Sequence, residues 1–174
     1  MLLSDGTGRF RLARAIGGLA LIALVAGCQV RPLYSTGGDV EGKLSSVSIS
    51  EADDRVEQQV RNGLIFLFAG GAGEPQTAAY HLDLNVTVRN VGVLLDIRTD
   101  VPRAGRLVVT ADFNLSKIDT GETVTSGRRS TVASVDFPIQ EFAKLRAVRD
   151  AENRAARELA ELIRADVAAA LARR

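Results

Sequence analysis

The clearest pattern in this chain is a strict alternation of apolar and polar side chains over residues 80–89. A period of two is typical of a β-strand with one covered face and one face in water. The apolar set is Tyr80, Leu82, Leu84, Val86 and Val88, and the polar set is His81, Asp83, Asn85, Thr87 and Arg89. The alternation returns over 106–119, where the predicted inward set is Leu107, Val109, Ala111, Phe113 and Leu115. We therefore predict two long strands over one apolar layer.

Further signals complete the predicted sheet. The alternation changes phase after Gly92, which indicates a β-bulge. Proline and glycine in the stretch VPRAG, 101–105, predict the turn between the two long strands. A second turn at 119–122 leads to a fourth strand over 123–136, whose weak pattern leaves its register open. A moderate strand signal also lies at 43–50.

Two segments show helical spacing instead. Over 53–68 the apolar residues Val56, Val60, Leu64 and Leu67 recur at three to four positions, with Ser50 or Asp53 available as the N-cap. The C-terminal segment has no glycine or proline after Pro138, which predicts a helix of about 25 to 30 residues. Its predicted apolar stripe is Val148, Ala151, Ala155, Leu159, Leu162 and Leu171.

These elements predict the fold class. Two amphipathic helices can cover the apolar face of one four-stranded mixed sheet. The expected architecture is an α+β two-layer sandwich with both helices on one face. It forms a single domain over 43–174, preceded by a segment at 28–42 whose glycines and Pro32 are typical of a tether.

The N-terminus has the pattern of an export signal. Arg9, Arg11 and Arg14 precede an apolar run over 15–26. A run of about 12 residues is too short to cross a bilayer as a helix, which takes about 20. Basic residues, a short apolar run and small residues at its end are typical of a secretory signal peptide, which we predict over 1–27.

Cys28 is the only cysteine in the chain and directly follows this signal. An exported chain with one cysteine cannot form an internal disulfide, so the thiol needs another explanation. Residues 24–28, LVAGC, resemble a bacterial lipobox, in which the cysteine is acylated and the chain is cut before it. Acyl chains on Cys28 would hold the protein at a membrane; the alternative is a small apolar residue that ends the signal. In similar lipoproteins, a residue such as Gln29 permits export to the outer membrane of a Gram-negative host.

The charge of the mature chain argues against a nucleic-acid partner. Residues 1–27 hold three arginines and one aspartate, so the formal net charge changes from +1 to −1 when they are removed. Nucleic-acid binding depends on neutralised phosphates, and this chain has no general charge for it. The 19 arginines against 3 lysines reflect either a GC-rich genome or bidentate binding of phosphate and carboxylate. The lack of tryptophan argues against a platform that stacks sugars or bases.

Catalytic machinery is hard to find. His81 is the only histidine, and it shares a strand face with Asp83, but no nucleophile motif such as G-x-S-x-G accompanies it. We interpret it as a solvated strand histidine. The glycines of 63–75 lack the Lys-Ser/Thr of a phosphate loop and follow a helix. One histidine and no spare cysteine also argue against a metal site. We expect no enzyme activity and no cofactor beyond the lipid on Cys28.

Arginines gather around the middle hairpin. With a turn centred near Pro102, Arg98 and Arg106 would lie opposite each other, with Arg103 at the tip. Like charges across a strand pair are unfavourable unless an anion lies between them. These three residues are therefore the candidate contacts to an anionic ligand or partner. The alternative is a hairpin charged against aggregation. Arg128 and Arg129 are a second, weaker candidate pair.

The stretch GCQVRPLY, 27–34, resembles the opening of the LptE family of LPS-assembly lipoproteins, especially its alphaproteobacterial members. The C-terminal segment RDAENRAARELAELIRADVAAAL and the order of elements are also similar to that family. The resemblance implies two helices on a four-stranded sheet and a lipid-anchored protein of the outer membrane. It implies a position on the periplasmic side or inside the LPS-translocon barrel LptD, where such proteins act as plug and assembly partner. It also implies binding of lipopolysaccharide, with no covalent chemistry.

Two other functions fit a small lipidated α+β domain. One is an accessory lipoprotein of an ABC-type lipid-trafficking system, which would not co-purify with an outer-membrane barrel. The other is an activator of a cell-wall synthase, whose depletion would disturb peptidoglycan before LPS export.

Overall fold

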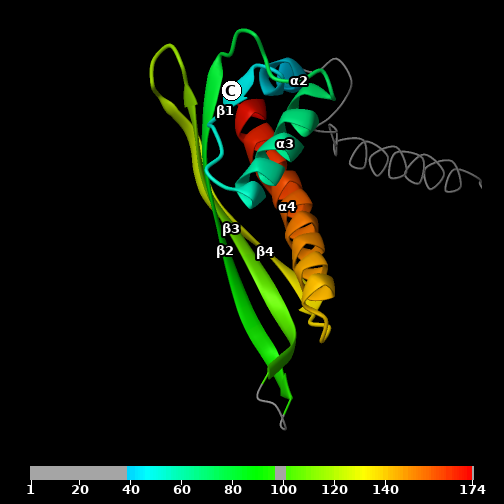
Figure 1. Cartoon of the computed structure of the whole chain (residues 1–174). Coiled ribbons are helices and arrows are strands. Elements are labelled where there is room, and N and C mark those ends of the chain that lie inside the picture. The colour runs from blue at the N-terminus through cyan, green and yellow to red at the C-terminus, as the bar shows by residue number, and fades with distance from the viewer. Residues whose placement is uncertain (1–38, 97–100, 174) are drawn as a thin grey trace, which may run out of the picture. The chain divides into compact units, whose positions relative to one another are not determined.

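The computed structural model describes residues 39–96 and 101–173, all within one unit, Thr36–Arg174. Cys28 and the predicted signal peptide lie outside the described residues. The elements follow in the order α2 (Asp39–Leu44), β1 (Val47–Ile49), α3 (Arg55–Ala69), β2 (Tyr80–Asp96), β3 (Val101–Lys117), β4 (Thr123–Asp136) and α4 (Glu141–Ala172), as labelled in Figure 1.

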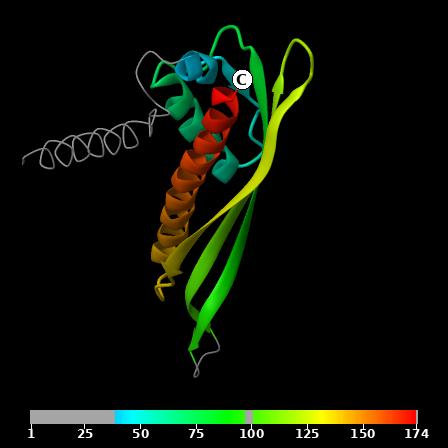
Figure 2. The same cartoon turned by 180° about the vertical axis from the view of Figure 1, so that it is seen from behind.

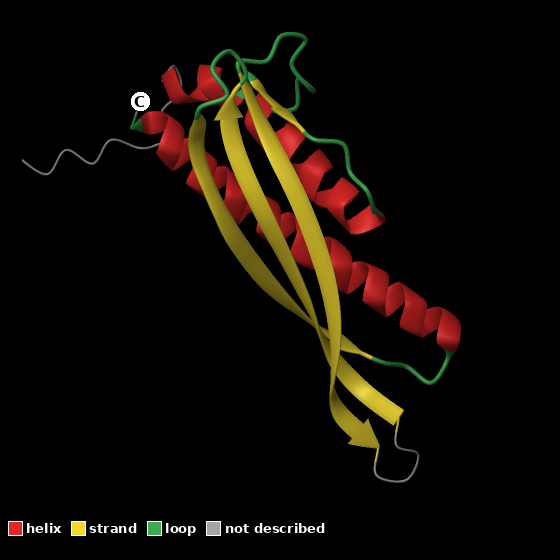
Figure 3. Cartoon of the chain, turned by 90° about the vertical axis from the view of Figure 1, so that its left-hand side faces the viewer, coloured by secondary structure: helices red, strands yellow, loops and turns green. Residues whose placement is uncertain are grey.

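The four strands form one sheet in the order β1-β2-β3-β4. β1 runs parallel to β2, whereas β2, β3 and β4 are antiparallel neighbours, so the sheet is mixed, as predicted. Helices α3 and α4 lie together along one face, and the opposite face is not covered by any described element (Figures 1 and 3). The predicted α+β sandwich is thereby confirmed, although a third helix, α2, adds to it.

The core lies between this sheet face and the helices. The inward residues of β2 are buried from Leu82 to Val86, and all five predicted inward residues of β3 are buried. Small residues let the two helices approach closely: a Cβ atom at Gly63 of α3 would lie 3.2 Å from that of Ala160 in α4. Alanines make up much of the buried face of α4 for the same reason: Ala151, Ala155, Ala156, Ala160, Ala168 and Ala170.

The N-cap of helix α3 lies one residue after Asp53 and four after Ser50, the two predicted caps. Its N-cap is Asp54, whose carboxylate accepts hydrogen bonds from the backbone N–H groups of Val56 (2.7 Å) and Glu57 (2.9 Å). These two donors would otherwise have no partner in the first turn. The helix ends at Gly70, which adopts the left-handed conformation (φ 58°) that glycine accepts without steric cost.

The N-terminal part of the domain differs from the prediction. Residues 39–44 form α2 where a tether and the start of a strand were expected, and β1 has only three residues. Leu44 ends the helix and is nevertheless buried, together with Val47 and Ile49 of β1. The apolar positions that indicated one strand are therefore shared between a short helix and a short strand.

The predicted turn at 101–105 is wrong. These residues begin β3, and the ladder pairs Pro102 with Leu95 and Gly105 with Gly92. Proline is tolerated there because β4 pairs with β3 only as far as Ala104, so β3 has one neighbour beyond that residue. The bulge predicted after Gly92 is confirmed by register shifts between Gly92 and Leu95.

Helix α4 has 32 residues, somewhat more than predicted. Most of the expected stripe faces the core, but Leu162 is partly exposed and the neighbouring Ile163 is fully buried in its place. On the polar side of α4, Arg154 is bound to Asp150, four residues earlier. Arg154 also donates to the backbone carbonyl of Ser134 at 3.1 Å, which ties the first half of α4 to β4.

Candidate functional site

The open face of the sheet carries the polar residues of the strand alternation. The register places three rows of three residues side by side: Asp83, Asn114 and Ser126; Asn85, Asp112 and Arg128; Thr87, Thr110 and Ser130. We call these nine residues the polar block. Hydrogen bonds join its parts: Thr110 and Ser130 hydroxyls are 3.1 Å apart, and Arg128 binds both carboxylate oxygens of Asp112 at 2.7 and 3.1 Å.

Two hollows indent this block. One has a volume of about 620 Å³ and is lined by Asp83, Leu84, Asn85, Asp112, Phe113, Asn114, Ser126 and Gly127. The other, of about 430 Å³, is lined by Thr87, Val88, Arg89, Val108, Thr110, Asp112 and Arg128. Asp112 lines both, so the two hollows adjoin.

The predicted arginine cluster is not assembled as expected. Arg106 lies opposite Val91, and Arg98 lies outside the described residues, so the proposed facing of the two is not supported. Arg103 lies at the irregular part of the ladder, between Ala104, which pairs with Leu94, and Pro102, which pairs with Leu95. Arg106 instead has Arg89 as a diagonal neighbour on the open face, since Arg89 pairs with Val108.

The adjacent arginines of β4 also point to opposite faces. Arg128 binds Asp112 on the open face, whereas Arg129 binds Asp166 of α4 with two contacts of 2.6 Å. In each case the hydrogen bond to the carboxylate raises the pKa of the guanidinium above its ordinary value. Arg128 and Arg129 thus serve as ties within the fold and do not form one anion site.

An exposed apolar cluster lies where α4 begins. Ile139, Phe142 and Leu145 are 80, 71 and 57 % exposed and recur at a spacing of three. Cationic groups accompany them: the Arg146 guanidinium lies 5.3 Å from the centre of the Phe142 ring, and the Lys144 ammonium 5.7 Å from that of Phe137. We call Ile139, Phe142 and Leu145 the distal cluster. The sequence pattern does not reveal the cluster, because its spacing of three leads on to Val148 and Ala151 of the core stripe.

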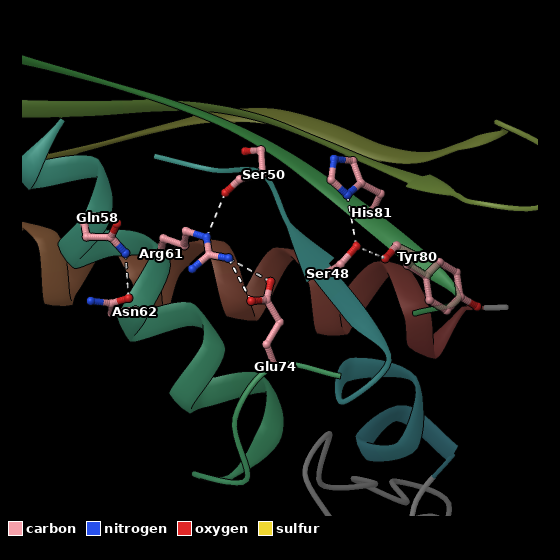
Figure 4. A network of polar contacts seen from close by, with 8 residues as sticks. All are labelled: Ser48, Ser50, Gln58, Arg61, Asn62, Glu74, Tyr80 and His81. Atoms are coloured by element: carbon pink, nitrogen blue, oxygen red, sulfur yellow. Dashed lines mark hydrogen bonds and ion pairs between the residues drawn. The ribbon is translucent and has the colours of Figure 1, made fainter. Parts of the chain in front are cut away.

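His81 has two polar neighbours. Its Nδ1 lies 3.0 Å from the Ser48 hydroxyl, and its Nε2 lies 3.5 Å from an Asp83 carboxylate oxygen (Figure 4 shows the Ser48 contact). The Ser48 hydroxyl also donates to the Tyr80 carbonyl at 3.2 Å, so its proton is directed away from the imidazole. A serine is activated as a nucleophile only when the histidine takes its proton. These contacts therefore fit a strand-to-strand link between β1 and β2.

The free edge of β2 is covered by side chains after β1 ends. The Ser50 hydroxyl accepts from Leu84 N–H at 3.0 Å, and the Glu57 carboxylate is hydrogen-bonded to the backbone of Val86. Arg61 supports this region, donating to the Ser50 carbonyl and to both oxygens of Glu74 at 2.9 Å (Figure 4). Burial raises the pKa of Glu57, the hydrogen bond from the Asp53 backbone opposes this rise, and the negative charges of Asp53 and Asp54 add to it.

Over residues 39–96 and 101–173, no group of three or more histidine, cysteine or acidic side chains is placed to hold a metal ion. In the same ranges, no helix combines the length and the apolar character needed to cross a membrane.

Comparisons with known proteins identify relatives of this fold. A crystal structure of a lipoprotein from Caulobacter crescentus CB15, described as putative, is similar with a TM-score of 0.64 and 29% identity, covering 78% of this chain and 96% of that one. The rare lipoprotein B from Shewanella oneidensis is similar at a TM-score of 0.55 and 16% identity, covering 71% and 92% of the two chains. At that identity the likeness concerns the fold alone. A comparison with curated proteins finds no match.

The family comparison is more specific. The model of the LptE family, described as lipopolysaccharide-assembly, matches residues 44–167. That range contains nearly the whole domain, from the end of α2 to the last turns of α4. Since the match covers well over half of the sequence, the chain belongs to the LptE family of lipopolysaccharide-assembly proteins.

Proposed function

We propose that this protein is an outer-membrane lipoprotein that acts as plug and assembly partner of the LPS-translocon barrel LptD and binds lipopolysaccharide during its export. The match of the LptE family model over residues 44–167 carries this proposal. The protein contributes no covalent chemistry; its work is binding and occupancy of the barrel, on the periplasmic side or within the lumen.

The membrane attachment rests on Cys28. The apolar run before it and the LVAGC stretch around it favour acylation of its sulfur. Since each buried methylene contributes about 0.8 kcal/mol, several acyl chains on one residue would hold the domain at the membrane. Cys28→Ala should leave an unlipidated precursor, as measured by mass spectrometry of the intact chain. Normal acylation of that variant would contradict the anchor.

Binding of lipopolysaccharide is supported by the surface near the start of α4 and the far part of the hairpin. The distal cluster exposes three large apolar side chains beside Lys144 and Arg146. Exposed apolar surface with adjoining cations suits a ligand that has acyl chains and phosphate groups. Arg98, Arg103 and Arg106 remain the proposed contacts to its anionic groups.

The decisive experiment is affinity purification of the tagged protein from detergent-solubilised outer membrane. We expect LptD and lipopolysaccharide in the eluate. Absence of a large barrel partner would contradict the plug role.

Arg103→Glu with Arg106→Glu should weaken lipopolysaccharide binding without unfolding the domain. Unchanged binding would favour the alternative, in which these arginines only protect the hairpin against aggregation.

A further inference from the structure

The polar block is a surface that neither the anchor nor the distal cluster explains. Nine neighbouring positions on three strands all carry side chains with hydrogen-bonding groups. Strands in a sheet are about 4.8 Å apart and same-face residues about 6.7 Å apart, so the block covers about 10 by 13 Å. An area of this size accommodates a short chain of two or three sugar rings.

The hydrogen-bonding groups of the polar block favour one class of ligand over others. It offers acceptors on Asp83 and Asp112, groups that both donate and accept on its amides and hydroxyls, and a donor on Arg128. Two carboxylates against one guanidinium do not favour phosphate, and the lack of apolar side chains does not favour acyl chains. Neighbouring sugar hydroxyls, each a donor and an acceptor, need such a mixed set. Such a surface binds a sugar through hydrogen bonds and needs no aromatic side chain stacked on the sugar ring.

The two hollows indent the surface of the polar block. They adjoin at Asp112, and their volumes of about 620 and 430 Å³ leave room for sugar rings. Gly127 borders the first hollow with its backbone, but it pairs with Phe113 and faces the covered side, where a Cβ atom would lie 2.9 Å from the Phe113 ring. A side chain at 127 would have to displace that buried ring.

Surfaces of different chemical character follow one another along the hairpin. Beyond the Thr87 row, the open face changes to Arg89 and Arg106 with the exposed valines Val91 and Val132. The hairpin then continues past the start of α4, where the distal cluster lies (Figure 3). Along the hairpin axis, the polar block and then the cationic zone lie on the open face, and the apolar distal cluster follows on the helix side. This is the order in which a glycolipid presents saccharide, phosphate and acyl chains.

We infer that the polar block binds the saccharide part of the exported glycolipid through hydrogen bonds to its hydroxyls. This inference rests on the proposed function and assigns a separate ligand portion to a separate surface. The amides of Asn85 and Asn114 are its central contacts, because both line the first hollow and each both donates and accepts.

The test is calorimetric titration of the full mature protein in detergent with lipid-free oligosaccharide, released from lipopolysaccharide by mild acid. We expect binding by the wild type and a loss of about tenfold or more in Asn85→Ala with Asn114→Ala, since the ligand loses hydrogen bonds to two amides. The matched control is Gln58→Ala with Asn62→Ala, two amides that bind each other on α3, away from the open face. The control variant should bind like the wild type.

Other results would overturn the inference. These are no oligosaccharide binding by the wild type, equal binding by the Asn85/Asn114 variant, or loss of LptD co-purification in that variant with oligosaccharide binding intact. The last result would make the block a barrel contact. The proposed function fails separately, if the wild type binds neither LptD nor intact lipopolysaccharide.

Discussion

The two halves of the β2–β3 hairpin follow one alternation but differ in what covers them. In the first half, Leu82, Leu84 and Val86 lie under the helices and are buried. Val88 continues the same face and is 37 % exposed. Figure 2, from behind, shows the hairpin extending past the end of α4 near residue 141. In β2, an apolar side chain on the inward face therefore has a different role on either side of Val86, whereas in β3 the buried positions continue to Leu107, the partner of Asn90.

The border between the halves is visible at the edge of β2 as well. β1 pairs with Tyr80–Leu82, the Ser50 side chain covers Leu84, and Glu57 covers Val86. Glu57 and Ser50 satisfy backbone groups that would otherwise be buried without partners. The first part of β2 is thus covered on its inward face and along its edge, whereas Val88 and Val91 beyond it are exposed to other molecules.

The largest expected effect separates the two halves directly. Leu82→Ala should destabilise the protein by about 2–5 kcal/mol, because it leaves a cavity in a fully buried site. Val88→Ala, on the same face, should cost less than about 1 kcal/mol, because water already reaches it. Denaturant unfolding of both variants measures the contrast. Similar losses of stability in the two variants would mean that the helices cover the inward face of β2 beyond Val86.

The inward face of β3 stays packed in the far half, and Gly105 tests one of these contacts. The ring of Phe137 lies over it, so a Cβ atom at 105 would be 2.6 Å from the ring. Gly105→Val should therefore cost about 1–3 kcal/mol through displacement of the ring. The control is Gly42→Ala, where nothing lies within 4 Å of the added atom and no loss of stability is expected.

Adding Phe137→Leu to Gly105→Val should recover part of the loss in the same unfolding measurement, because a smaller side chain leaves room for the valine. No recovery would show that the cost arises elsewhere in the hairpin.

Gly105 also explains why the turn was misplaced. The sequence signal in VPRAG is real, since proline and glycine favour turns. Here, however, Gly105 leaves space for the ring of Phe137, which is distant in sequence, and Pro102 occupies a position where β3 has lost its second neighbour. Both causes are tertiary, so no local pattern reveals them. The error then carried over to the arginines, whose expected facing depended on the turn.

The alternation, by contrast, predicted the core of β2 and β3 residue by residue, because one covered face imposes a period of two. The alternation could not predict where the helices stop covering β2, since Val86 and Val88 are both valines in the same pattern. For the same reason it could not predict the distal cluster or the polar block, which depend on register and on the extent of α4. The helix α2 is too short for periodicity to detect.

A smaller effect is expected at the N-cap of α3, which positions the covering helix. Asp54→Ala should cost about 1 kcal/mol, because two backbone N–H groups lose their acceptor. Asp53→Ala is the matched control: its backbone N–H still donates to Glu57 (3.2 Å), and no bond of its own carboxylate caps the helix. Thermal unfolding of the two variants should differ clearly. Equal shifts would argue against Asp54 as the cap.

The smallest effect concerns the ionisation of Glu57 at the border. Burial raises its pKa in the folded state above the ordinary value of 4.5, so the folded protein takes up the proton more readily than the unfolded chain. Lowering the pH from neutral through that raised pKa should therefore stabilise the wild type relative to Glu57→Gln, and the difference should become constant below 4.5. Parallel denaturant titrations at several pH values measure it. A difference that changes in the opposite direction would show that hydrogen bonds to the ionised carboxylate outweigh its burial, and that the border of the covered half is held by a charge.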